Sequence, residues 1–191
     1  MDAHLLSELK HISHSMFNKN YFGVFHGSIS AKVTINSFII NKKNTILDEV
    51  NEDEFIHLSC NTQKDYRWKD ASVDVEIHEK IYQTMPQAKY ISYTMPPYAT
   101  AYSLNHELVI PKDFYGCEIL DKTFVYDPKG FNDWKERAPE EISDFFKNNN
   151  SHLLLIKGFG LISYDRDLTE MVKKVAILEN SCRLLTINSM N

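Results

Sequence analysis

The chain has 191 residues, of which 43% are hydrophobic and 25% charged, a size and composition typical of one soluble globular domain. Its formal net charge of -5 provides no general attraction to nucleic acid or to an anionic membrane. No segment approaches the ~18 apolar residues that are needed to cross a bilayer. The start lacks the basic and apolar regions of a secretory signal, and the three cysteines are widely spaced without a C-x-x-C motif. We therefore expect a cytoplasmic protein with reduced thiols.

The first sixty residues are predicted to contain one helix and three strands. Residues 2–17 place apolar side chains at spacings of three and four, which is typical of an amphipathic helix. Between residues 29 and 40, apolar and polar positions alternate on either side of Asn36, and this pattern predicts an antiparallel hairpin. Residues 55–58 form a further short strand candidate.

The middle of the chain returns to helical spacing at residues 74–83. Residues 89–94 are then predicted to form a buried strand. Pro96 and Pro97 must end this strand, because proline donates no backbone hydrogen bond. A short helix is expected to follow at residues 98–104, opening on proline.

The region from 108 to 125 is predicted to hold short strands, broken by turns around Pro111 and Gly116. A helix is expected at residues 132–148, with an apolar face toward the core. The asparagine-rich run that follows it is expected to end the helix.

Two strands and a long helix are predicted to close the chain. Residues 152–163 are apolar but are interrupted by Gly158 and Gly160, which indicates two strands joined or bent there. Asp167 and Glu170 have the spacing of a capping box, and apolar residues at helical spacing follow them. Helices around a strand-rich centre indicate an α/β or α+β domain.

Four segments, in their order and spacing, resemble motifs of the class II aldolase/adducin family. They are residues 27–30 (Gly-Ser-Ile-Ser, for G-N-[IV]-S), 71–78 (for P-S-S-E-x-x-x-H), 90–101 (for V-V-H-T-H-P and a helix) and 154–161 (for L-L-R-N-H-G-L). The resemblance covers nearly the whole chain. It implies a single domain over residues 1–191 of the α/β class (α+β type), with three α/β/α layers and a central, mainly antiparallel sheet.

The resemblance also implies that the family's metal site has been lost. Members of the family hold a divalent metal, usually zinc, with three histidines, and the metal acts as a Lewis acid on the substrate. The matching positions here are Tyr93, Met95 and Phe159. A thioether, a phenyl ring and a neutral phenol are poor zinc ligands, so no metal and no cofactor are expected.

Two polar residues of the second motif remain as catalytic candidates. The family's acid/base glutamate falls on Asp74, which could exchange protons or could simply favour the start of a helix. His78 keeps the position of the motif's histidine. It could orient Asp74 or simply pack as a satisfied polar residue, and the sequence leaves both alternatives open.

Ser28, Ser72 and Lys43 are the candidates for binding a phosphate group. Ser28 replaces the asparagine of the first motif, and Ser72 remains from a serine pair in which Val73 replaces the second member. Lys43 lies in a turn where it could hold an anion by charge. A turn of this composition is, however, more often only a soluble connection.

Two functions are consistent with these features. The first is a non-catalytic member of the family, as in its adducin branch, which binds a small anionic or apolar ligand or serves in protein assembly. The alternative is a lyase (aldolase) or epimerase acting on a sugar phosphate, with Asp74, His78 and a tyrosine such as Tyr93 doing acid/base work. The resemblance further implies a homo-oligomer, such as a tetramer. Neither nucleic acid nor a membrane is expected as a partner.

Overall fold

The computed structural model describes residues 3–48, 50–60 and 64–189. Its centre is one eight-stranded sheet with the strand order β3-β2-β1-β4-β8-β7-β6-β5. The strands are β1 (Ser28–Thr34), β2 (Ser37–Asn41), β3 (Phe55–Ser59), β4 (Tyr90–Thr94), β5 (Leu108–Val109), β6 (Thr123–Tyr126), β7 (Leu153–Ile156) and β8 (Gly160–Asp165). The β6–β7 pair is parallel, and the other pairs between these strands are antiparallel. The predicted mainly antiparallel sheet is therefore confirmed.

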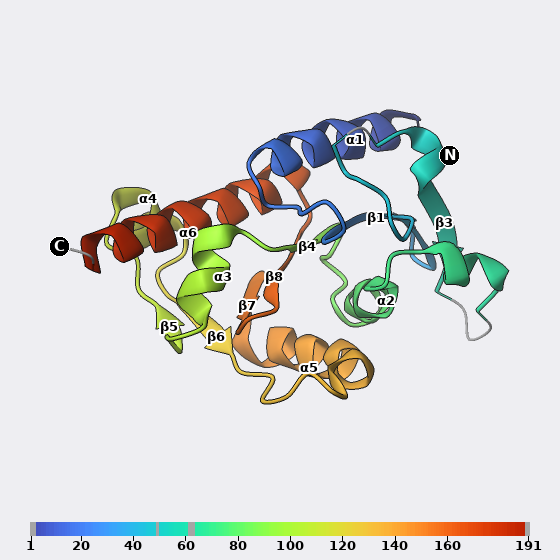
Figure 1. Cartoon of the computed structure of the whole chain (residues 1–191). Coiled ribbons are helices and arrows are strands. Elements are labelled where there is room, and N and C mark those ends of the chain that lie inside the picture. The colour runs from blue at the N-terminus through green and yellow to red at the C-terminus, as the bar shows by residue number, and fades with distance from the viewer. Residues whose placement is uncertain (1–2, 49, 61–63, 190–191) are drawn as a thin grey trace.

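Helices cover both faces of the sheet. They are α1 (Ala3–Asn18), α2 (Val75–Thr84), α3 (Pro97–Ser103), α4 (Phe114–Ile119), α5 (Trp134–Asn149) and α6 (Leu168–Ser189), together with the short 3-10 helices η1 (Glu52–Glu54) and η2 (Tyr66–Asp70). Figure 1 shows α1 and α6 on one face, and α2 and α5 on the other. This is the predicted three-layer α/β/α arrangement. Within the described residues, no helix has the length and apolar character to span a membrane.

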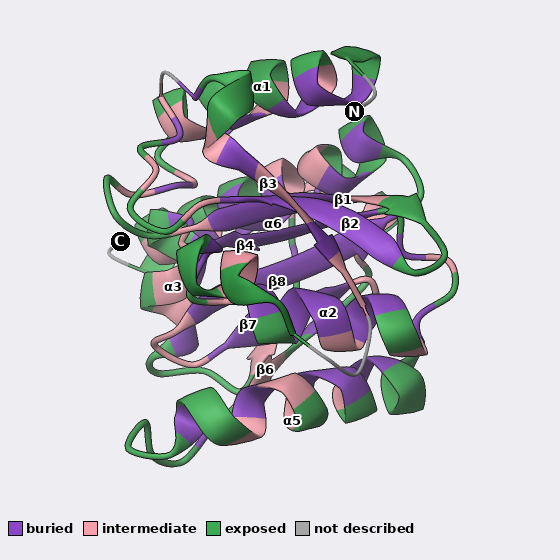
Figure 2. Cartoon of the chain, turned by 90° about the vertical axis from the view of Figure 1, so that its right-hand side faces the viewer, coloured by how far each residue is buried: buried purple, intermediate pink, exposed green. Residues whose placement is uncertain are grey.

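Two hydrophobic clusters fill the space between the sheet and its helices. One contains apolar residues of α1 and α6, and the other contains those of α2 and α5. Strands β2 and β8 are buried at every position, because helices or loops cover both of their sides. In Figure 2 the middle strands of the sheet are correspondingly buried, while the outward sides of the helices are exposed.

Strand β1 divides its side chains between these two layers. Ile29 and Ala31 belong to the cluster with α1 and α6. Ser28 and Ser30 alternate with them and contact His78 of α2 on the opposite face. The alternation that predicts this strand thus also directs two buried serine hydroxyls toward α2.

The prediction for residues 108–125 was wrong in one respect, since α4 lies where only strands and turns were expected. The Asp113 carboxylate accepts the Gly116 backbone N–H at 3.0 Å and caps the start of this helix. A Cβ atom on Gly116 would lie 2.4 Å from both Pro111 Cβ and Ser181 Oγ. Gly116 therefore allows α4 to pack closely against α6, and it does not mark a turn.

Candidate functional site

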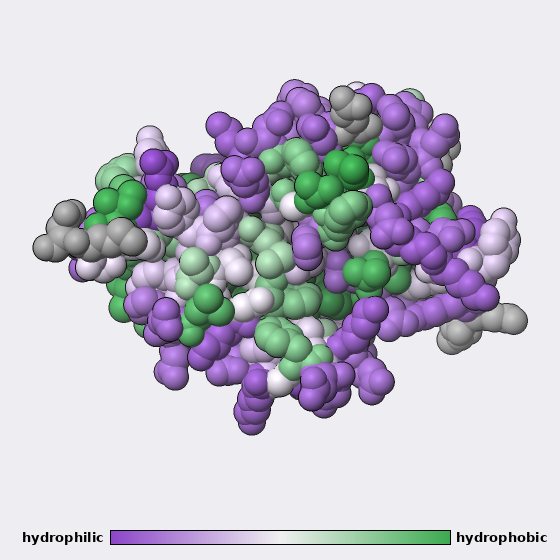
Figure 3. Space-filling view, in the orientation of Figure 1, coloured by the Kyte–Doolittle hydropathy of each residue, from purple (hydrophilic) through white to green (hydrophobic). Residues whose placement is uncertain are grey.

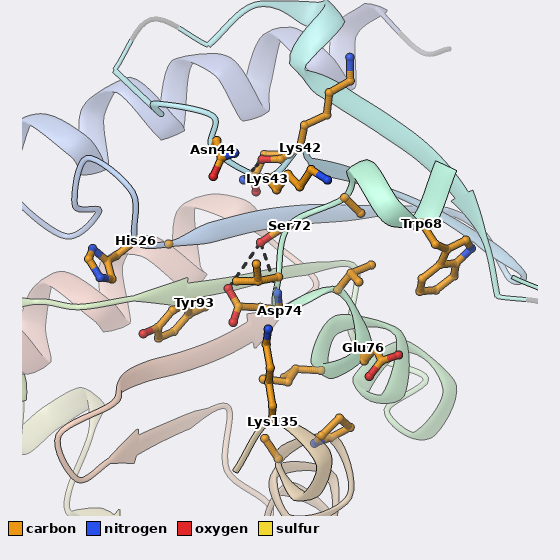
Figure 4. A pocket seen from close by; sticks show the side chains of 18 of the residues that line it. His26, Lys42, Lys43, Asn44, Trp68, Ser72, Asp74, Glu76, Tyr93 and Lys135 are labelled. Carbon is orange, nitrogen blue, oxygen red and sulfur yellow. Dashed lines mark hydrogen bonds between the residues drawn. The ribbon is translucent and has the colours of Figure 1, made fainter. Parts of the chain in front are cut away.

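A cavity of about 700 Å³ opens at the start of α2. The turns before β1 and after β2, the segment from η2 into α2, and the start of α5 contribute its walls (Figure 4). Of the candidates from the sequence, the cavity is lined by Lys43, Ser72, Asp74, Tyr93 and Phe159. Ser28 and His78 are fully buried and do not line it.

Asp74 is the residue before the first turn of α2 and is partly buried at the cavity wall. Its Oδ2 atom accepts hydrogen bonds from Ser28 Oγ and Ser72 Oγ, both at 3.4 Å. Burial raises the pKa of this carboxyl to about 6, although the two serines and the positive charge of Lys135 act in the opposite direction. Asp74 therefore exchanges its proton close to neutral pH.

His78 is completely buried on the inner side of α2. Its Nε2 lies 2.8 Å from Ser28 Oγ, and its Nδ1 lies 2.6 Å from Ser30 Oγ. Burial lowers the pKa of the imidazole to about 3, so His78 is neutral at physiological pH. Its side chain reaches Asp74 only through the Ser28 hydroxyl, so any orientation of Asp74 by His78 would act through Ser28.

Tyr93, Met95 and Phe159 lie together around the start of β8. The Tyr93 hydroxyl donates to the Phe159 carbonyl at 2.8 Å, and the two rings are stacked with 4.6 Å between their centroids. A Cβ atom on Gly160 would lie 3.0 Å from Tyr93 Cε2 and 3.1 Å from Met95 Cγ. The three positions that resemble the family's metal site thus form one mainly apolar cluster.

The cavity carries more positive than negative side chains. Five lysines line it (Lys42, Lys43, Lys64, Lys69 and Lys135), together with three carboxylates (Asp74, Glu76 and Glu136). Lys43 is less free than predicted, because its Nζ donates to the Lys69 carbonyl at 2.7 Å and lies 3.7 Å from Asp70 Oδ1. The excess of lysines favours an anion in the cavity.

Sequence reasoning missed Lys135, whose ammonium group points toward Asp74 in Figure 4. Lys135 lies in the first turn of α5, far from the four motifs. No spacing rule connects it with Asp74, because the packing of α2 on α5 brings the two residues together. Sequence reasoning also missed Ser30, which is the serine of the first motif and contacts His78.

Three comparisons with known proteins agree with this fold. The sequence model for the family "Class II Aldolase and Adducin N-terminal domain" matches residues 7–186. An L-fuculose phosphate aldolase from Methanococcus vannielii is 25% identical over 182 residues, which are 94% of this chain and 94% of that protein.

Solved structures of similar proteins share the fold at low sequence identity. L-fuculose-1-phosphate aldolase from Thermus thermophilus matches with a TM-score of 0.86 and 18% identity, over 98% of this chain and 95% of that one. YgbL from Escherichia coli, a putative aldolase/epimerase/decarboxylase, matches with a TM-score of 0.79 and 16% identity, over 96% and 88%.

These relatives correct the expectation that the protein has no cofactor. L-fuculose phosphate aldolases are zinc-dependent, so a divalent metal is the norm among the proteins that this chain resembles. The side chains at the three matching positions do not fit that metal in the family's manner. Met95 offers a thioether and Phe159 a phenyl ring, and the Tyr93 phenol has a pKa raised by burial and donates its proton to a carbonyl. Among the described residues, no group of three or more His, Cys, Asp or Glu could hold a metal ion.

Proposed function

The chain belongs to the class II aldolase and adducin family, and we propose that it binds a small anionic ligand of the sugar-phosphate class without cleaving it. The binding site is the cavity beside Asp74. Its relatives are described as sugar-phosphate aldolases, which supports the ligand class. The excess of lysines in the cavity supports an anionic ligand independently of any relative.

The contact between Tyr93 and Phe159 is the observation that carries the proposal for a non-catalytic protein. Aldol cleavage requires stabilisation of the negative charge that develops on the substrate. At the positions that would supply this stabilisation, a phenol is hydrogen-bonded to the backbone and stacked on a phenyl ring. These groups pack against each other and form a mainly apolar surface, which does not stabilise a negative charge.

A lyase or epimerase remains the second candidate, and Asp74 favours it. A carboxyl group with a pKa of about 6 beside an open cavity is suited to general acid/base work near neutral pH. His78 does not provide the partner, because it is buried, neutral and outside the cavity. Asp74 would therefore need a charge-stabilising group other than Tyr93, whose hydroxyl is already engaged with the Phe159 carbonyl.

Titration calorimetry together with an aldolase assay tests the proposal. We expect L-fuculose 1-phosphate and inorganic phosphate to bind to the purified protein, more weakly at high salt because the attraction is ionic. Lys135→Gln should weaken this binding several-fold. Lys112→Gln, outside the cavity, should leave it unchanged.

The same samples are assayed for cleavage of L-fuculose 1-phosphate, with and without added zinc. Binding without product formation supports a non-catalytic protein. Release of an aldehyde product at a rate that depends on Asp74 would replace the proposal with the lyase. Equal binding by Lys135→Gln and Lys112→Gln would contradict the cavity as the binding site.

We also propose that the protein is a homo-oligomer, and specifically a tetramer. Homologues in this family are typically oligomeric, which supports assembly in general. Exposed apolar residues border the cavity, among them Phe25 at 71% and Val73 at 63% exposure. Figure 3 shows apolar groups in the middle of one face, surrounded by hydrophilic ones. A neighbouring subunit would cover such groups.

A further inference from the structure

A row of buried polar side chains runs between strand β1 and helix α2, behind the cavity. Ser28 and Ser30 are two residues apart on the strand, while His78 and Tyr82 are four apart on the helix. Two residues of a strand and four of a helix both advance by about 6 to 7 Å, so the two pairs face each other in register. The first three are completely buried and Tyr82 is 3% exposed.

Consecutive hydrogen bonds connect this row with Asp74. Tyr82 Oη lies 2.8 Å from Ser30 Oγ, and Ser30 Oγ lies 2.6 Å from His78 Nδ1. His78 Nε2 lies 2.8 Å from Ser28 Oγ, and Ser28 Oγ donates to Asp74 Oδ2 at 3.4 Å. At the far end, Tyr82 Oη is 3.4 Å from the Lys89 carbonyl.

Only two arrangements place a proton in each of the three short contacts, which join Tyr82 to Ser30, Ser30 to His78, and His78 to Ser28. A neutral imidazole has one N–H and one acceptor nitrogen, and each hydroxyl donates one proton. Either every donor is directed toward Asp74, with the His78 proton on Nε2, or every donor is directed toward the Lys89 carbonyl, with that proton on Nδ1. The position of one proton on His78 therefore determines the direction of all the bonds.

The two ends of the row favour the direction toward Asp74. A carboxylate is a stronger acceptor than a peptide carbonyl. The Lys89 carbonyl already accepts the Lys32 backbone N–H at 2.7 Å.

We propose that Tyr82, Ser30 and His78 form a one-directional hydrogen-bond chain that directs the Ser28 hydroxyl proton toward the Asp74 carboxylate. His78 is then a positioning residue with the Nε2–H tautomer, and it acts on Asp74 through Ser28. The chain stabilises the ionised form of Asp74 against the burial that opposes it. Other charged or titratable groups near Asp74 are Lys135 and Glu136 of α5, His26 before β1, Tyr93 of β4 and Glu76 of α2.

Nuclear magnetic resonance of the ligand-free protein tests the chain directly. The ¹⁵N shifts and couplings of His78 report its tautomer, and the ¹³C shift of the Asp74 carboxyl reports its pKa. In the natural protein at pH 8, where Asp74 is ionised, we expect the Nε2–H tautomer. A His78 proton on Nδ1 would overturn the proposal without any variant.

Two variants should affect Asp74 in different ways. Ser30→Ala removes the donor to Nδ1, so both tautomers become populated and the Ser28 hydroxyl can turn from Asp74 to His78. The pKa of Asp74 should then rise by roughly one unit. Tyr82→Phe removes the acceptor that the opposite direction needs, so the Nε2–H tautomer persists and the pKa of Asp74 stays equal or falls.

Ser92→Ala is the matched control, because Ser92 is an equally buried serine on β4 that pairs with Ser163 Oγ at 2.7 Å. It should change neither the tautomer nor the pKa of Asp74. A rise in this pKa of similar size in all three variants would show a general loss of packing and would contradict a directed chain. Because these measurements use no ligand, the chain can fail or hold independently of the proposed binding function.

Discussion

Asp74 and His78 have opposite effects on the pH dependence of stability, although a single hydroxyl separates them. The pKa of Asp74 is raised to about 6, so between about pH 4 and pH 6 the folded protein holds a proton that the unfolded chain has released. Its contribution to the free energy of unfolding therefore decreases as the pH rises through this window. The pKa of His78 is lowered to about 3, so its contribution decreases as the pH falls below about 6.5. In the natural protein the two effects partly cancel.

Replacing Asp74 with asparagine should leave His78 as the main source of the pH dependence of the free energy of unfolding that these two residues cause. Asparagine is an equally good residue before a helix and carries no charge to bury. We expect Asp74→Asn to raise the free energy of unfolding by about 1–2 kcal/mol at pH 8, and this gain should vanish below about pH 4. Urea denaturation at a series of pH values measures the gain at pH 8 and the pH at which it vanishes. Asp53→Asn, at an exposed site, is the control, and an equal gain at all pH values would contradict the raised pKa.

The cluster of Tyr93, Met95 and Phe159 can be tested by restoring histidine at all three positions. If these residues occupy the family's metal positions, the triple variant should bind one more zinc ion per chain than the natural protein. Three imidazoles in this arrangement suffice for a zinc site with an open position. The zinc content of the dialysed protein is measured for the triple variant and for the natural protein. The single variant Phe159→His is the control. No increase in zinc in a folded triple variant would show that the positions were wrongly matched.

At the scale of elements, α6 stabilises the beginning of α3 across the fold. Helix α3 starts after Pro96, which supplies no side-chain cap. The Glu179 carboxylate of α6 accepts the backbone N–H groups of Tyr98 at 3.0 Å and Ala99 at 2.8 Å. A buried glutamate from a distant helix thus satisfies donors that the first turn of a helix leaves free.

Removing this carboxylate should destabilise the protein, because the buried N–H of Ala99 and the partly buried N–H of Tyr98 would lose their acceptor. We expect Glu179→Ala to lower the free energy of unfolding by about 2–3 kcal/mol and Glu179→Gln by roughly half as much, since the amide oxygen can still accept. Urea denaturation measures both. Glu170→Ala, whose side chain forms an exposed pair with Lys173, should change the value by less than about 1 kcal/mol. Equal losses from Glu179→Ala and Glu170→Ala would contradict the capping role.

At the scale of the whole molecule, the exposed apolar residues beside the cavity bear on assembly. We expect light scattering coupled to gel filtration to give a mass several times the 22.2 kDa of one chain. Phe25→Asp should reduce this mass, because a charge would have to be buried where subunits meet. Ile35→Asp, at a site 83% exposed and away from the cavity, is the control. A single-chain mass for the natural protein would contradict the homo-oligomer, and the tetramer with it.

Much of the architecture could be predicted from sequence where periodicity is strong. The hairpin of β1 and β2, the buried strand β4, and helices α1, α2, α5 and α6 lie close to their predicted ranges. Helix α4 was missed because its support comes from Asp113 and from close packing on Ser181. Neither contact leaves a periodic signal. The extent of a single domain over residues 1–191 stays a prediction.

For the site, the sequence by itself determined the family. It also predicted Asp74 and His78 as catalytic candidates, and Tyr93, Met95 and Phe159 as the positions that match the family's metal ligands. Motif order and spacing suffice for these, because they depend on residue identity along the chain. Only the tertiary structure decided that Lys135 approaches Asp74 and that Ser30 and Tyr82 connect with His78. It also placed Tyr93 against Phe159. These contacts join residues from different elements. They depend on how the helices pack on the sheet, and no local sequence pattern predicts that packing.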